Sequence, residues 1–277
     1  MAELAEDLPP VCRVRAGHGE VCWREAGPRD GIPLVLLHGI GSGAGSWRAQ
    51  FRTLARHFRV LAWDAPGYGD STPLAESAPL AADYAQALSD TLAGLDAKPA
   101  IVVGHSLGAL MAAAFAHAEP AALRVLILAS PVRGYGRAEP AVRARVSKDR
   151  IQRLEELGID GLAASRCARL VSPQAPAEVV DHLRRTMMRA TAGGYRQAVH
   201  LLLHDDLPSV LGAGSRPRAV LCGTLDQVTP PAACRALAAE LGSRYVELEG
   251  LAHASYVEAP ERFDAAVLEL LADQTGC

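Results

Sequence analysis

The residue best placed to do chemistry is Ser106, in the stretch from Val102 to Gly108 (VVGHSLG). A short apolar run ends there in Gly-x-Ser-x-Gly and continues into an alanine-rich segment without proline. This order predicts a buried strand, a turn too tight for a side chain at either glycine, and a helix, with the Ser106 hydroxyl at the apex. The pattern alone arises by chance in about one such chain in ten. It therefore indicates a nucleophile only if the chain also supplies a base, an acid and an oxyanion site.

Two polar residues near the C-terminus can complete this chemistry. Asp226 ends an apolar run that begins near Arg218, and His253 follows the run Tyr245–Leu248. A serine hydroxyl is a poor nucleophile at neutral pH unless a histidine takes its proton, and a carboxylate fixes the tautomer of that histidine. The sequence therefore predicts a catalytic triad of Ser106, Asp226 and His253.

An oxyanion formed at Ser106 needs backbone N–H donors. Leu107, directly after the serine and at a predicted helix N-terminus, is expected to supply one. Ile40, in a glycine-rich loop after the apolar run Pro33–Leu37, is expected to supply the other. Such a loop can instead hold a phosphate, but the chain lacks the P-loop pattern and a complete dinucleotide-binding pattern. His38, beside the loop, is expected to be structural.

The elements that must position these residues alternate along the chain. The predicted strands are Pro33–Leu37, Phe58–Trp63, Ala100–Val103, Leu123–Ala129, Arg218–Asp226 and Tyr245–Leu248, and helices are expected between them. An edge hairpin is expected from Val11–Arg15 and Glu20–Glu25. The alternation predicts an α/β fold with a mostly parallel, doubly wound sheet, whose strands carry functional residues at their carboxyl ends.

Residues 132–206 differ from this pattern and predict an inserted helical cap, or lid. They contain no β-branched run, and proline and glycine separate several amphipathic stretches. The expected helices are Val142–Leu157, Leu162–Leu170, Ala177–Ala190 and Tyr195–His204. Residues 1–131 and 207–277 are then the core. His200 and His204 have helical spacing but no third ligand nearby, so no metal site is expected.

Composition narrows the class of protein. The 277 residues, 49% hydrophobic and 21% charged, fit one α/β domain with an insertion. A net charge of −3 gives no reason to expect nucleic acid or a membrane surface as partner. The six cysteines are scattered, which predicts reduced thiols. With no secretory signal pattern or membrane-length apolar run, we expect a cytoplasmic protein. The oligomeric state stays open.

The matching motifs together resemble the α/β-hydrolase superfamily over nearly the whole chain. They are the His38–Gly39 loop, Asp64–Ser71 (DAPGYGDS), the serine turn, Asp226 and His253. The resemblance implies an α/β-hydrolase sheet with a helical cap and a cofactor-free serine hydrolase that works through an acyl-enzyme. A serine nucleophile separates the chain from the haloalkane dehalogenases and epoxide hydrolases of this fold, which use aspartate. Ala109 departs from the family pattern, where many relatives carry a further glycine.

Segments of the predicted cap are similar to those of 3-oxoadipate enol-lactonases. They are Met188–Thr191 (MRAT), Gly194–Tyr195 and Asp206–Leu207. This similarity implies a small carboxylic ester or lactone as substrate and a role in the breakdown of aromatic compounds. C–C hydrolysis of a vinylogous diketone is an alternative, although meta-cleavage hydrolases usually carry Asn at the position of His105. Cofactor-free perhydrolysis and a non-catalytic small-molecule receptor also remain open.

The candidates for the substrate pocket come from the turn, the glycine-rich loop and the cap. They are Gly39, His105, Met187, Met188 and Leu203. Methionine suits an adaptable pocket wall, but the two methionines and Leu203 fit a helical core at least as well.

Overall fold

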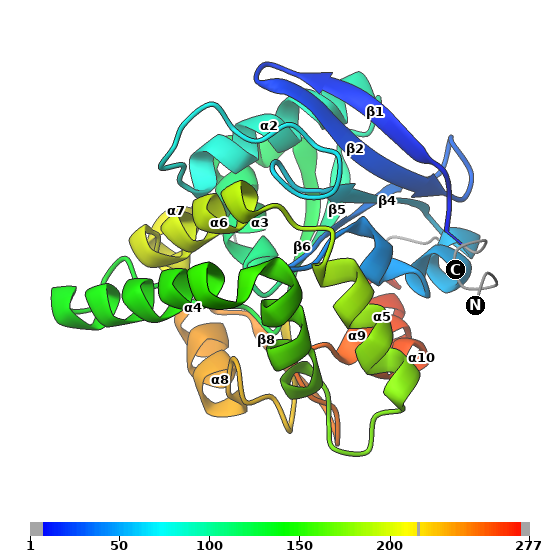
Figure 1. The fold of residues 1–277 in the computed structure, drawn as a ribbon. Coiled ribbons are helices and arrows are strands. Elements are labelled where there is room, and N and C mark those ends of the chain that lie inside the picture. The colour runs from blue at the N-terminus through cyan, green and yellow to red at the C-terminus, as the bar shows by residue number, and fades with distance from the viewer. Residues whose placement is uncertain (1–7, 215–216, 273–277) are drawn as a thin grey trace.

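The strands of the protein form one sheet in the computed structural model, which describes residues 8–214 and 217–272 (Figure 1). Within these ranges the eight strands lie in the order β1-β2-β4-β3-β5-β6-β7-β8. They are β1 (Val11–Ala16), β2 (Gly19–Ala26), β3 (Pro33–Leu37), β4 (Arg59–Asp64), β5 (Ala100–His105), β6 (Leu123–Ala129), β7 (Ala219–Gly223) and β8 (Arg244–Leu248).

Strand direction divides this sheet into a short antiparallel edge and a parallel body. β1 pairs antiparallel with β2, and β2 with β4. All remaining neighbours, from β4 through β8, pair in parallel. The carboxyl ends of β3, β5, β6, β7 and β8 therefore meet at one edge of the sheet. The predicted fold class, including the hairpin at the sheet edge, is confirmed.

Helices cover both faces of the sheet because its central strands are apolar on both sides. Val35 and Val102 pack with Leu88 on one face, whereas their neighbours Leu34 and Ile101 face the side of Phe263. The helices are α1 (Gln50–Thr53), α2 (Ala81–Gly94), α3 (Gly108–Ala118), α4 (Pro140–Arg166), α5 (Ala177–Met187), α6 (Ala192–His204), α7 (Leu207–Leu211), α8 (Pro231–Glu240), α9 (Ser255–Glu258) and α10 (Pro260–Leu270). Short 3-10 turns occur at Ala44–Trp47, Leu54–Arg56, Pro120–Ala122 and Cys167–Leu170.

The segment between β6 and β7 is helical, as the sequence predicts. Figure 1 shows α4, α5 and α6 gathered on one side of the molecule. α4 bends at Gly158, whose φ of 61° and ψ of −175° are not helical, so it consists of two stretches that match the two predicted helices. α7 was not predicted, and the Asp206 side chain accepts from Ser209 N–H at its start. The division into core and cap stays a prediction.

Two close backbone approaches fasten this segment to the core. The Thr191 hydroxyl donates to Gly67 O at 2.8 Å, and Gly69 N–H donates to Arg189 O at 3.1 Å. A Cβ atom on Gly194 would lie 2.1 Å from Gly67 O, so a side chain cannot fit there. The loop after β4 thus holds the α5–α6 turn against the core.

Five of the six cysteines lie in the part of the chain that the structure describes. Cys12, Cys22, Cys167, Cys222 and Cys234 are free thiols, and Cys277 lies outside the described residues. Within the described ranges, no helix combines the length and apolar character that a membrane crossing requires.

Candidate active site

The turn that carries Ser106 is shaped by its two glycines. β5 ends at His105 and α3 begins at Gly108, and Ser106 has a φ of 53°, a value that residues other than glycine rarely adopt. A Cβ on Gly104 would lie 2.6 Å from Gly108 O, and one on Gly108 would lie 2.4 Å from Leu37 O. The prediction that neither glycine can carry a side chain is therefore confirmed. The tight turn leaves Ser106 at the wall of a cavity.

Asp226 and His253 come from the loops after two neighbouring parallel strands, β7 and β8. The Nδ1 atom of His253 lies 2.8 Å from Asp226 Oδ2, and both side chains are buried. His253 lines the same cavity as Ser106. The structure therefore brings the predicted nucleophile and base to one cavity and places the acid against the base.

Asp226 is held as a carboxylate by its neighbours. Its Oδ1 atom accepts the N–H groups of Val228 and Thr229 at 2.8 and 2.9 Å, and its Oδ2 atom accepts the Thr229 hydroxyl at 2.8 Å. Burial opposes ionisation, but the hydrogen bonds from His253 and Thr229 outweigh it and lower the pKa of Asp226 to about 2. The carboxylate favours a proton on His253 Nδ1, which leaves Nε2 as an acceptor.

Thr229 was missed by the sequence reasoning. Its position three residues after Asp226 is the available signal, because an aspartate often accepts hydrogen bonds from the groups two and three residues later in a turn.

Backbone donors are available beside Ser106. The hydrogen bonds of the described residues leave the N–H groups of Ile40 and Leu107 without an acceptor, and both residues line the cavity. In contrast, Gly41 N–H donates to Tyr68 Oη at 3.4 Å, and Ser42 N–H donates to Gly39 O at 3.2 Å. Leu107 also precedes α3, where the helix dipole favours negative charge. These free donors suit an oxyanion.

His38 holds the glycine-rich loop in place. Its Nε2 atom accepts from Ala65 N–H at 3.0 Å, and its Nδ1–H donates to Gly39 O at 2.9 Å. Burial lowers the pKa of His38, so the ring is neutral. These contacts fit the structural role that the sequence suggested.

His105 is buried beneath the same cavity. Its Nε2–H donates to the backbone oxygen of His253 at 2.9 Å. Burial, together with the neighbouring His253, lowers the pKa of His105 to about 3. A neutral His105 thus supports the loop that carries His253.

The predicted pocket residues divide into two groups. Gly39 and His105 line the cavity, which has a volume of about 80 Å³, whereas the three cap candidates are absent from its described lining. Met187 is buried against Gly41, and Leu203 packs into the core. Met188 follows Met187 at the end of α5 and points about 100° away from it around the helix axis. Its surface is 41% exposed. The cap candidates thus fill the core or face solvent.

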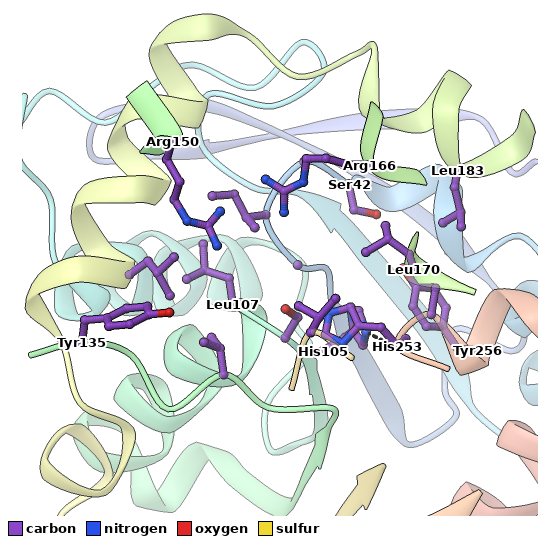
Figure 2. A pocket seen from close by; sticks show the side chains of 18 residues that line it. Ser42, His105, Leu107, Tyr135, Arg150, Arg166, Leu170, Leu183, His253 and Tyr256 are labelled. Carbon is purple, nitrogen blue, oxygen red and sulfur yellow. Dashed lines mark hydrogen bonds between the residues drawn. The ribbon is translucent and has the colours of Figure 1, made fainter. Parts of the chain in front are cut away.

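Two arginines that the sequence reasoning did not select line the cavity instead. Arg150 and Arg166 both belong to α4 (Figure 2). The available signal was spacing: Arg150 lies four residues from Val146 and four from Leu154, so it interrupts the apolar side of a helix.

Known proteins resemble most of the chain. A family model described as "Alpha/beta hydrolase family" matches residues 34–266. A pimeloyl-[acyl-carrier protein] methyl ester esterase of Yersinia enterocolitica is 30% identical, over 90% of this chain and 96% of that protein.

Solved structures share the fold over nearly the whole chain. An esterase from Thermogutta terrifontis, with malate bound, has a TM-score of 0.84 at 25% identity and covers 96% of this chain and 99% of its own. The enol-lactonase from Burkholderia xenovorans has a TM-score of 0.82 at 24% identity, covering 95% of this chain and 100% of its own, and supports the fold alone. The chain belongs to the alpha/beta hydrolase family.

Proposed function

We propose that the protein is a serine hydrolase that cleaves a small carboxylic ester or lactone through an acyl-enzyme. Its family and the esterases among its relatives make it a hydrolase that acts on ester bonds. One observation carries the finer proposal. A single cavity is lined by a serine in a strained turn, a histidine paired with a carboxylate, and two residues whose N–H groups have no acceptor in the part of the chain that the structure describes.

These groups can carry out every step of the reaction. His253 Nε2 takes the proton of Ser106 as the Oγ atom attacks the carbonyl carbon, and the N–H groups of Ile40 and Leu107 stabilise the oxyanion. His253 then gives the proton to the departing alkoxide, leaving an acyl group on Ser106. Water attacks this ester in the same way, and Ser106 regains its proton as the acid leaves. Asp226 stays ionised and stabilises the imidazolium.

The cavity favours a small substrate. Its volume of about 80 Å³ holds only a handful of water molecules, so it fits a short acyl group or a small lactone. Since the chain supplies nucleophile, base and oxyanion donors, the reaction requires no cofactor. A cytoplasmic location remains part of this proposal.

Replacement of Ser106 by alanine tests the assignment. We expect kcat for a short ester to fall by roughly 10⁵- to 10⁶-fold, because the nucleophile is lost. Ser42→Ala is the matched control, since it removes a serine hydroxyl from the lining of the same cavity. Retention of wild-type kcat in Ser106→Ala would disprove the proposal.

A further inference from the structure

Two positive side chains enter the cavity from above. Figure 2 shows the guanidinium groups of Arg150 and Arg166 directed into it, across from His105 and His253. Among the described residues that line the cavity, these arginines are accompanied by no aspartate or glutamate. The cavity therefore carries positive charge that its own walls do not neutralise.

The guanidinium of Arg150 has unused bonding capacity. Its Nη1 atom is buried and has no hydrogen-bond partner among the described residues. Arg166 Nη1 donates to the neutral hydroxyl of Tyr195 at 2.8 Å. Arg153, about one turn further along α4, differs from Arg150 because it forms an ion pair with Asp149 at 3.0 Å. A buried cationic donor without a partner is unfavourable, so an anion bound at Arg150 would gain a charge-assisted hydrogen bond.

The approach to the cavity is also positive. An adjoining groove of about 500 Å³ shares Arg150 and Arg166 with the cavity, and it is further lined by Arg145, Arg153 and Arg169. Among the described residues that line this groove, Asp149 is the only acidic one. Clefts lined by one sign of charge raise the local concentration of the opposite ion. The groove thus favours entry of an anionic molecule.

We propose that Arg150 and Arg166 form a carboxylate clamp, so that the preferred ester or lactone itself carries a free carboxylate. This inference rests on the proposed function, because the clamp acts on the substrate of Ser106. Planar guanidinium groups match the geometry of a carboxylate, and arginine keeps its charge when buried. Because both arginines line the same cavity as Ser106, we expect the carboxylate to lie within a few carbon atoms of the scissile carbonyl.

Matched pairs of esters test the clamp. Monoethyl glutarate and ethyl pentanoate differ in a carboxylate on the acyl side, whereas carboxymethyl butyrate and ethyl butyrate differ in a carboxylate on the alcohol side. In each pair the carboxylate replaces a methyl group. We expect wild-type kcat/KM to favour the anionic member of at least one pair. Arg150→Gln should lower that anionic-to-neutral ratio by about 10- to 100-fold, the range of a lost hydrogen bond to a charged group. Arg150→Lys should restore part of it.

Arg196→Gln is the control for loss of charge alone. Arg196 is an exposed cap residue that pairs with Glu155 at 3.2 Å and lies outside the described lining of cavity and groove. The ratio should be unchanged in this variant. A wild-type preference for the neutral ester in both pairs, or an unchanged ratio in Arg150→Gln, overturns the clamp while leaving the proposed function intact.

Binding measured by calorimetry tests the clamp independently of turnover. Glutarate should bind Ser106→Ala and bind at least tenfold more weakly when Arg150→Gln is added. Equal binding, or none in either protein, would overturn the clamp. Failure of the proposed function is recognised separately, as hydrolysis that persists in Ser106→Ala.

Discussion

The floor and the roof of the cavity differ in how their polar groups are satisfied. The floor consists of Ser106, Asp226 and His253 at the carboxyl edge of the sheet, and Asp226 accepts four hydrogen bonds there, from Val228, Thr229 (twice) and His253. The roof is the clamp, where Arg150 Nη1 has no acceptor within the described part of the chain. The protein itself thus supplies the hydrogen bonds that fix the floor residues, whereas a ligand would supply the missing partner of Arg150 in the roof. Changes in the floor should affect all substrates, and changes in the roof should discriminate between them.

After loss of the nucleophile itself, the largest effect is expected from Asp226→Asn. Loss of the charge that stabilises the His253 imidazolium should lower kcat by about 10⁴-fold, equally for anionic and neutral esters. Steady-state kinetics with the matched ester pairs measures this. Asp181→Asn, which removes an exposed carboxylate paired with Arg184, serves as control. A loss below tenfold, or one confined to anionic esters, would contradict the division between floor and roof.

His105, next to Ser106 in the floor, should make the free energy of unfolding of the protein depend on pH. Its pKa falls from 6.5 to about 3 on folding, so the unfolded chain binds a proton in this window that the native protein does not. His105 therefore costs no stability above about pH 6.5, and the free energy of unfolding should fall by about 1.4 kcal/mol per pH unit below it, towards pH 3. Urea unfolding of wild type and His105→Asn at several pH values isolates this slope. Parallel curves for the two proteins would refute it.

Gly194→Ala tests the contact that holds the α5–α6 turn against the loop after β4. Its Cβ would meet Gly67 O at 2.1 Å, and we expect the free energy of unfolding to drop by about 1–3 kcal/mol, as for other overpacked sites. Gly193→Ala is the matched control, because the nearest atom to its Cβ would be 3.9 Å away. Thermal unfolding should leave that control at least as stable as wild type. Equal stability of the two variants would argue against a tight junction.

The smallest effect is expected from salt. Raising the ionic strength from about 20 to about 200 mM should lower kcat/KM for the anionic esters about two- to fivefold, because salt screens the arginines of the groove. The neutral esters should show no such change. An equal response of both classes would mean that the groove does not steer the substrate.

The floor could be predicted from the sequence because its residues terminate strands. Ser106, Asp226 and His253 each follow a run that the parallel sheet buries, and strands of this kind bring their carboxyl ends together. Ile40 was predictable for the same reason, from the loop after β3.

The roof could not be predicted in the same way. The direction of Arg150 depends on the tilt of α4 and on its bend at Gly158, and helical periodicity alone sets neither. Met188 shows the same limit: it was a pocket candidate, yet 41% of its surface is exposed. Spacing revealed which helix faces were apolar, but not which residue on them would reach the cavity.

Covalent labelling tests most directly whether Ser106 is the nucleophile. A fluorophosphonate should form a single adduct on Ser106 with loss of fluoride, and hydrolysis of both ester classes should disappear in proportion to labelling. Peptide mass spectrometry locates the adduct, and residual activity is measured on the same samples. An unlabelled Ser106, or full activity in a completely labelled protein, would contradict the account.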